Sequence, residues 1–289
     1  MALLELLQTS PAWLTVSAGL LGLIIGSFLN VVALRLPARM FYQWRRECRE
    51  MLELPPGDEP APDGLVLPRS RCPHCRAAIR ARDNTPVLGW LLLRGRCRDC
   101  GAGISPRYPI IEAVTGLLSA WVAWHFGFSP EALFALGLTW ALIALTVIDL
   151  DHMILPDNIT LPLVWAGLLL SLGGWFTDPV SAIIGAAAGY LALWSVFHLF
   201  RLLTGKEGMG YGDFKLLAVF GAWLGWQALP GVILFSSLVG AVVGITLIVT
   251  GRQERTVPIP FGPYLAAAGW IMLMWGSDIN QAYLGFVGI

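Results

Sequence analysis

Long apolar runs make up most of the chain, and short polar segments separate them. A helix needs about 20 apolar residues to cross the hydrocarbon core of a bilayer. Runs of roughly this length predict eight membrane helices, at residues 13–33, 108–126, 131–148, 159–175, 180–202, 214–229, 231–250 and 261–275. The first run has no basic segment before it and no small-residue cleavage site after it, so we interpret it as a membrane helix rather than a signal peptide.

Composition supports this interpretation. Of the 289 residues, 56% are hydrophobic and only 13% are charged, whereas about a quarter of the residues in a soluble domain are charged. An ordinary soluble enzyme is therefore excluded, and we expect an all-α polytopic membrane protein. The formal net charge is zero, so net charge indicates no class of partner, and nothing points to nucleic acid.

The positive charges fall on one side of the predicted membrane. If the N-terminus is outside, the segment 34–107 and three short loops on the inner side, with their flanks, hold all 19 Lys and Arg residues. Five of these belong to the short loops: Arg201, Lys206, Lys215, Arg252 and Arg255. The predicted outer segments carry only acids: Glu5, Glu131, Asp178 and Asp278. Because cytoplasmic loops are enriched in Lys and Arg, the pattern predicts both termini outside and the segment 34–107 in the cytoplasm.

This topology predicts three parts: a first membrane helix at 1–33, a cytoplasmic insert at 34–107 and a membrane core of seven helices at 108–289. The insert contains all five cysteines. Four of them form "CPHC" and "CRDC": Cys72, Cys75, Cys97 and Cys100. Two such turns present four thiolates to one ion, the spacing of structural zinc sites.

A structural metal suits a small cytoplasmic insert, because disulfides are rare in that compartment and a short segment builds little core. The alternative is two unrelated pairs of reactive or buried thiols. Cys48 lies outside the pattern, and we interpret it as a free thiol. We leave His74 out of the ligand set because four cysteines already complete a tetrahedral shell.

Carboxylates gather at two ends of predicted membrane helices, where an ionisable group is costly and so a candidate for function. Asp149, Asp151 and Asp157 surround the end of the third helix, and Asp213 opens the sixth in "GYGDFK". The order of the helices puts Asp149 and Asp213 at the same, cytoplasmic face. Two carboxylates held close together take different protonation states and can catalyse hydrolysis as acid and base.

Other interpretations of these residues stay open at this point. Asp213 could cap its helix and Asp157 lies in the N-cap region of the next one, whereas Asp149 sits at a helix C-terminus, where the helix dipole disfavours an anion. Spacing does not rank Asp151 firmly below Asp149. An ion channel or transporter would need more ionisable groups within the helices, where the other deep candidates are His125 and His198. A zinc-stapled scaffold without chemistry leaves the aspartates unexplained.

The motifs resemble one family. "GYGDFKLL" is similar to the GxGD motif of membrane aspartyl proteases, and with "IDLDHMILPD" it resembles the type IV prepilin peptidases, which are bifunctional leader peptidases and N-methyltransferases. "IGSFLNVVALRLP" at 25–37, the two cysteine pairs and "GRCRDCGAGISPRYPIIE" at 95–112 are similar to the N-terminal region of that family.

The resemblance implies that Asp149 and Asp213 are catalytic and that Cys72, Cys75, Cys97 and Cys100 bind metal. It implies prepilins and type II secretion pseudopilins as substrates, cleaved after a glycine at the cytoplasmic face of the inner membrane. As a polytopic membrane protein, the chain also has membrane lipid as an expected partner. The resemblance also implies methylation of the new N-terminus with S-adenosylmethionine.

The residues that bind the methyl donor are not indicated. "GMGYG" follows no strand and is a poor nucleotide loop, so by elimination we expect the donor in the insert, with the turn at 94–96 as a candidate. A GxGD peptidase without methyltransferase activity is the alternative, which loss of the insert would favour; this chain has the insert.

Overall fold

The computed structural model describes residues 2–55, 57–206, 208–251 and 259–287, and every regular element in these ranges is a helix. This confirms the all-α prediction. The chain divides into two compact units, Met1–Trp140 and Ala141–Ile289, and helix α5 (Pro130–His152) contributes to both. The predicted boundaries at residues 33 and 107 stay a prediction.

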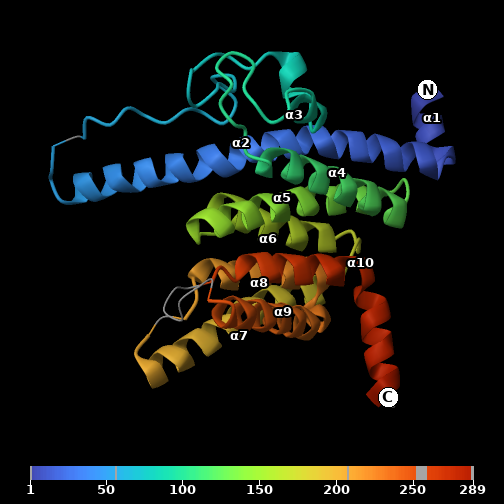
Figure 1. Ribbon diagram of the computed structural model, residues 1–289. Coiled ribbons are helices and arrows are strands. Elements are labelled where there is room, and N and C mark those ends of the chain that lie inside the picture. The colour runs from blue at the N-terminus through green and yellow to red at the C-terminus, as the bar shows by residue number, and fades with distance from the viewer. Residues whose placement is uncertain (1, 56, 207, 252–258, 288–289) are drawn as a thin grey trace. The chain divides into compact units, whose positions relative to one another are not determined.

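The first unit is built on a close antiparallel pair of helices, α2 and α4 (Figure 1). Gly22 of α2 lies against Ser119 of α4, and a Cβ atom on Gly26 would come within 2.7 Å of the Glu112 Cα. Small residues allow such close approach of two membrane helices. The elements of this unit are α1 (Ala2–Thr9), α2 (Pro11–Met51), η1 (Ala81–Asn84), α3 (Leu88–Leu92) and α4 (Arg107–Phe126), with the first half of α5.

Helix α2 is much longer than the membrane segment predicted at 13–33. It continues without interruption through Pro37 to Met51. The apolar pattern identifies only the part of the helix that suits a membrane. The remainder, "RMFYQWRRECREM", stays helical because Arg, Met and Glu are strong helix formers.

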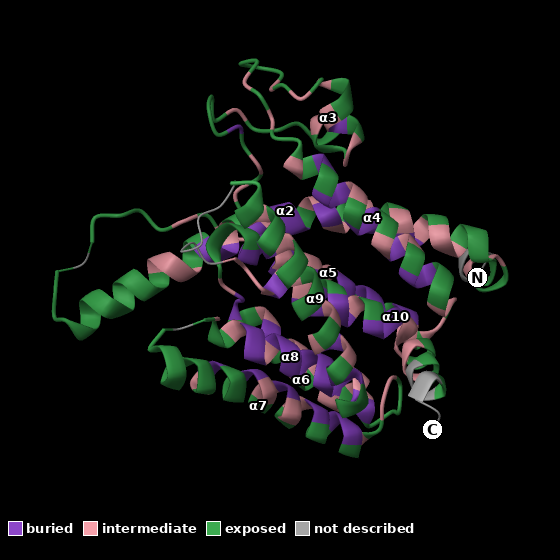
Figure 2. Ribbon diagram, turned by 60° about the horizontal axis from the view of Figure 1, so that its bottom comes forward, coloured by how far each residue is buried: buried purple, intermediate pink, exposed green. Residues whose placement is uncertain are grey.

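The second unit surrounds α8, whose residues from Asp213 to Trp223 are nearly all buried (Figure 2). Helix α7 crosses α8 at two glycines, Gly185 against the backbone of Gly221 and Gly189 against the carbonyl of Leu217. These close backbone contacts hold α8 against α7. The unit contains α6 (Asp157–Ser171), α7 (Pro179–Thr204), α8 (Tyr211–Leu224), η2 (Trp226–Ala228), α9 (Leu229–Val249) and α10 (Gly262–Val287), with the second half of α5.

Four described helices are long and apolar enough to cross a membrane: Pro11–Met51, Pro130–His152, Pro179–Thr204 and Trp226–Val249. The membrane class is therefore confirmed, but a count of eight crossings is not. Helix α8 ends before the predicted boundary at 229 because Gly225 adopts a positive φ of 80°, which favours glycine. Arg252 and Arg255 lie outside the described residues, and the orientation stays a prediction.

Candidate active site and metal centre

Asp149 lies in the last turn of α5, and its side chain is buried, with 5% of its surface exposed. Its Oδ2 atom accepts a hydrogen bond of 3.0 Å from the backbone N–H of Gly262, the first residue of α10. The positive N-terminal end of α10 therefore faces the carboxylate and offsets its unfavourable place at the C-terminus of α5.

Asp213 is the third residue of α8 and is 6% exposed. Its Oδ2 atom accepts a hydrogen bond of 3.3 Å from the N–H of Gly210, which is the N-cap residue. The expectation that Asp213 could itself be the N-cap is therefore wrong. Asp213 lies at the third helical position, and its carboxylate accepts a hydrogen bond from the N–H of the N-cap residue, Gly210. A capping role uses one carboxylate oxygen and leaves the other available.

One buried leucine links the surroundings of both carboxylates. A Cβ atom on Gly212, beside Asp213, would lie 2.7 Å from the Leu155 Cβ, and one on Gly262 would lie 3.1 Å from the Leu155 Cδ2. The carboxylates of Asp149 and Asp213 interact electrostatically. The structure thus brings together two aspartates from different helices of the same unit.

The neighbouring aspartates differ from this pair. Asp151 is exposed, because two residues along a helix turn a side chain by about 200° away from Asp149. Asp157 opens α6, and both of its oxygens accept hydrogen bonds from the Lys215 ammonium, at 2.6 and 2.7 Å. Burial therefore distinguishes Asp149, which is buried, from Asp151, which is exposed. The spacing of the two residues in the sequence did not distinguish them.

Two residues that make buried polar contacts, Gly262 and Glu112, were not predicted from the sequence. Gly262 contacts Asp149 across 113 positions of the chain, and its only signal in the sequence is the Pro/Gly-rich stretch "PFGP" at the start of the last helix. Glu112 lies inside the run predicted at 108–126 and is 8% exposed, so the histidines were not the only other deep ionisable residues. His125 instead packs on Phe126 in the last turn of α4.

The four cysteines form one cluster in the first unit. Their Sγ atoms all lie within 4.8 Å of one another, an arrangement that could hold a metal ion, and none is in a disulfide. The Cys72 and Cys100 sulfurs are 3.8 Å apart. Cys48 is a free, exposed thiol outside this cluster, and His74 is not among its ligand atoms, as expected.

The two cysteine turns share one backbone pattern. Cys72 N–H donates to the carbonyl of Ala77, five residues on, and Cys97 N–H donates to that of Ala102 in the same way. In each turn at least one thiol also lies close to a backbone amide, Cys72 in the first turn and Cys100 in the second. The amides of Cys75 and His74 lower the pKa of the Cys72 thiol to about 6.

The charge of four thiolates would be difficult to hold without a cation. The Ala102 amide favours the Cys100 thiolate, but burial and the neighbouring sulfurs together raise the pKa of Cys100 to about 12. Asp83 is bound by Arg98 through a hydrogen bond of 2.8 Å from Nε, and this guanidinium holds the pKa of Asp83 below its usual value. The ion pair joins η1 to the second cysteine turn.

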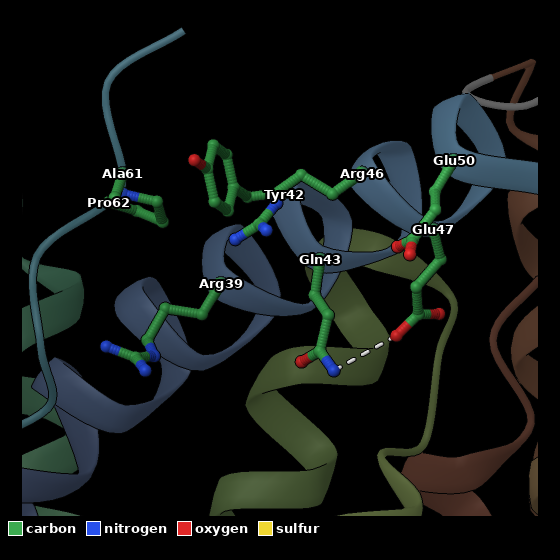
Figure 3. A pocket seen from close by; sticks show the side chains of 8 residues that line it. All are labelled: Arg39, Tyr42, Gln43, Arg46, Glu47, Glu50, Ala61 and Pro62. Atoms are coloured by element: carbon green, nitrogen blue, oxygen red, sulfur yellow. Dashed lines mark hydrogen bonds between the residues drawn. The ribbon is translucent and has the colours of Figure 1, made fainter. Parts of the chain in front are cut away.

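The C-terminal half of α2 borders a polar hollow of about 470 Å³. Figure 3 shows the Arg46 guanidinium beside the Tyr42 ring, with the returning chain at Pro62 opposite. Glu47, which accepts a hydrogen bond of 3.1 Å from Gln43, lies on the same helix. The hollow therefore offers charges of both signs and an aromatic ring.

Comparisons with known proteins agree with this arrangement. The Bacterial Peptidase A24 N-terminal domain matches residues 20–126, and the Type IV leader peptidase family matches residues 136–245. The chain is 55% identical to the prepilin leader peptidase/N-methyltransferase of Stutzerimonas stutzeri, over 98% of both chains. It belongs to the type IV leader peptidase family.

Other members of the family are similar over the whole length. The prepilin leader peptidase/N-methyltransferase of Aeromonas hydrophila is 57% identical over 98% of both chains. That of Pseudomonas aeruginosa is 53% identical over 100% of this chain and 99% of its own. No solved structure matches the chain. The family membership confirms the resemblance seen in the motifs.

Proposed function

We propose that the chain removes the leader peptide of type IV prepilins and type II secretion pseudopilins after a glycine, and then methylates the new N-terminal amine. Family membership and relatives of equal length that carry both activities in their names support this proposal. The single observation that carries the peptidase activity is the pair of buried carboxylates, Asp149 and Asp213, in one helical unit.

In this proposal Asp149 and Asp213 share the work of acid and base. Like charges held close together do not both ionise cheaply, so one carboxylate is charged while the other holds a proton. The charged one takes a proton from water as its oxygen attacks the scissile carbonyl carbon, and the other gives its proton to the carbonyl oxygen. When the C–N bond breaks, the carboxyl group that took the proton from water gives it to the leaving amine, and the other carboxylate takes back a proton from a hydroxyl of the tetrahedral intermediate, which restores the pair. The pair titrates together, so neither residue is assigned one role.

Backbone donors hold the two carboxylates in position. The N–H of Gly262 binds Oδ2 of Asp149, and the N–H of Gly210 binds Oδ2 of Asp213. Within the described part of the chain, the Oδ1 atoms accept no hydrogen bond. Each Oδ1 atom is therefore available to water or substrate.

We also propose that the cysteine cluster holds zinc in a structural role. Zn–S bonds of about 2.3 Å in a tetrahedron require sulfurs about 3.8 Å apart, and the distance between Cys72 and Cys100 is 3.8 Å. Four thiolates complete the shell and leave no position for a catalytic water. Zinc would therefore stabilise the insert, and the hydrolysis is assigned to the aspartates.

S-adenosylmethionine is the proposed methyl donor, bound by the cytoplasmic insert. Transfer of a methyl group from a sulfonium to a neutral amine depends on orientation more than on a strong base. The donor carries a carboxylate, a cationic centre and an adenine ring, and the hollow beside Arg46, Tyr42 and Glu47 offers a complement to each. The turn at 94–96 remains the second candidate.

The proposed location is the bacterial inner membrane, with the N-terminus outside and the aspartates at the cytoplasmic face. The distribution of Lys and Arg supports this orientation. A prepilin carries a polar leader before an apolar helix, so its scissile bond would lie at the same boundary.

Mass spectrometry of the substrate N-terminus, with and without S-adenosylmethionine, tests both activities on purified enzyme and prepilin in detergent. Asp149→Asn and Asp213→Asn should each abolish leader removal while leaving the protein folded. Asp151→Asn is the matched control, because this aspartate is exposed and should be dispensable. Cleavage at a near wild-type rate by either variant of the pair would remove that residue from the mechanism.

A further inference from the structure

The short helix α3 presents apolar side chains to its surroundings. Leu88, Leu91 and Leu92 are 57%, 55% and 81% exposed, although the sequence assigns this segment to the cytoplasmic insert. Three exposed leucines within five residues form a contiguous apolar surface, which usually marks a site of contact with a protein or a membrane.

The pairing of α2 with α4 gives a scale of depth for this unit. The first charged residue after the apolar run of α2 is Arg35. Gly26, which lies against the Glu112 Cα, is nine residues before Arg35, or about 13 Å along the helix axis. The Asn30 amide donates to the carbonyl of Tyr108 at 3.2 Å, in the same antiparallel register. The backbone of Glu112 therefore lies about 13 Å deeper than the level of Arg35.

A hydrogen bond fixes α3 to this deep residue. The buried Glu112 carboxylate accepts a bond of 2.7 Å from the N–H of Val87, the residue directly before α3. An extended glutamate side chain and one hydrogen bond together reach about 8 Å. Even if both pointed straight toward the cytoplasm, α3 would begin about 5 Å deeper than Arg35. Figure 1 accordingly draws α3 beside the apolar part of α2 and far from its end at Met51.

The charges that follow α3 suit the same placement. Arg94 and Arg96 come directly after the helix and are exposed, and neither pairs with a carboxylate among the residues that the structure describes. Arginines at the edge of an apolar surface extend their charged ends to the headgroup region, where anionic lipids attract them. This complementarity favours lipid over a protein as the occupant.

We infer that α3 is an interfacial membrane anchor. Its leucines lie among the acyl chains of the cytoplasmic leaflet, and Arg94 and Arg96 lie at the phosphates of anionic headgroups. The cysteine-bearing insert is thereby held on the membrane surface by its own apolar helix, in addition to the covalent links to α2 and α4. The depth of the tether on Glu112 and the exposure of the leucines carry this inference independently of any activity.

Photo-crosslinking to lipid tests it in the full-length protein. The photoreactive residue p-benzoylphenylalanine replaces Leu92 in protein reconstituted into nanodiscs of phosphatidylethanolamine and phosphatidylglycerol, and intact mass spectrometry counts phospholipid adducts. Two matched positions serve as references, because both are exposed and apolar. Leu117, in the middle of α4, is 71% exposed, and Met51, at the cytoplasmic end of α2, is 83% exposed.

Adducts at Leu92 should be comparable to those at Leu117 and several-fold more frequent than those at Met51. Adducts no more frequent than at Met51 would overturn the inference, as would crosslinks from Leu92 mainly to another part of the chain or to a second copy. Combined with the Leu92 probe, Glu112→Ala should lower the lipid adducts, whereas Glu112→Gln keeps an acceptor for Val87 and should retain them. If Glu112→Ala does not fold, the comparison of the three probe positions decides alone.

Discussion

A methyl group on Gly262 should slow leader cleavage without unfolding the protein. A Cβ atom at this position would lie 2.6 Å from Oδ2 of Asp149 and 3.1 Å from Cδ2 of Leu155. Ordinary contact begins at 3.4 Å, so the Asp149 carboxylate must move by about 0.8 Å. A displacement of about 1 Å in a catalytic group can lower a rate by about 100-fold. We therefore expect Gly262→Ala to lower the rate constant of cleavage by about 10- to 100-fold.

The assay follows leader removal from a purified prepilin in detergent, with thermal unfolding of the same sample as the test of folding. Gly137→Ala is the control, because this glycine lies in α5 with Asp149 and a Cβ atom there would meet nothing within 4 Å. Methylation of an already trimmed pilin should be unchanged in both variants, since the insert is untouched. A Gly262→Ala enzyme that cuts as fast as wild type would refute the reasoning, and so would an equal loss in Gly137→Ala.

Three further outcomes follow from the packing and the charges. Cys72→Ser, or chelation, should release one metal ion per chain and expose the insert to limited proteolysis; metal analysis of the wild type that finds none would contradict the zinc site. Gly221→Ala should lower the unfolding midpoint far more than Gly137→Ala, because its Cβ would collide with the backbone of Gly185; equal midpoints would show that α7 and α8 can separate freely. Asp178 caps α7 through its carboxylate, and the Ser181 side chain and amide hold its pKa below the usual 3.8. Asp178→Ala should therefore destabilise the protein at pH 7, and the difference from wild type should shrink as the pH falls below about 4, since the ionised form makes the cap; a difference independent of pH would argue against it.

The order of the predicted helices placed Asp149 and Asp213 at the same face of the membrane, but it did not predict the distance between them. Apolar length and charge distribution assigned both residues to the same face, and the structure brings them together across two helices. Their ranking against Asp151 required the helical phase, because residues two apart point in different directions and only one of them is buried.

The hydrogen-bond donors and packing neighbours of Asp149 and Asp213 could not be predicted from the sequence. Gly262 reaches Asp149 only through the fold, because 113 positions separate them. Glu112 was missed for a different reason, because one carboxylate in an otherwise apolar run does not change the prediction of a membrane helix. Cysteine spacing, in contrast, predicted a metal cluster directly, because each turn is local and its backbone pattern needs no distant partner.

Helix α2 continues through Pro37 to Met51, so a tilt of its apolar part also moves its polar C-terminal part. From Arg35 to Met51 it extends for about 24 Å, and the returning chain is held to it by Arg35 on the Gly64 carbonyl and by Arg45 on Glu59. A tilt of about 10° in the membrane half would move the free end by about 4 Å. The close contact of α2 with α4 would pass the same tilt on to Glu112. A displacement of the C-terminal end of α2 should therefore be accompanied by a displacement of Glu112, because Gly26 lies directly against it.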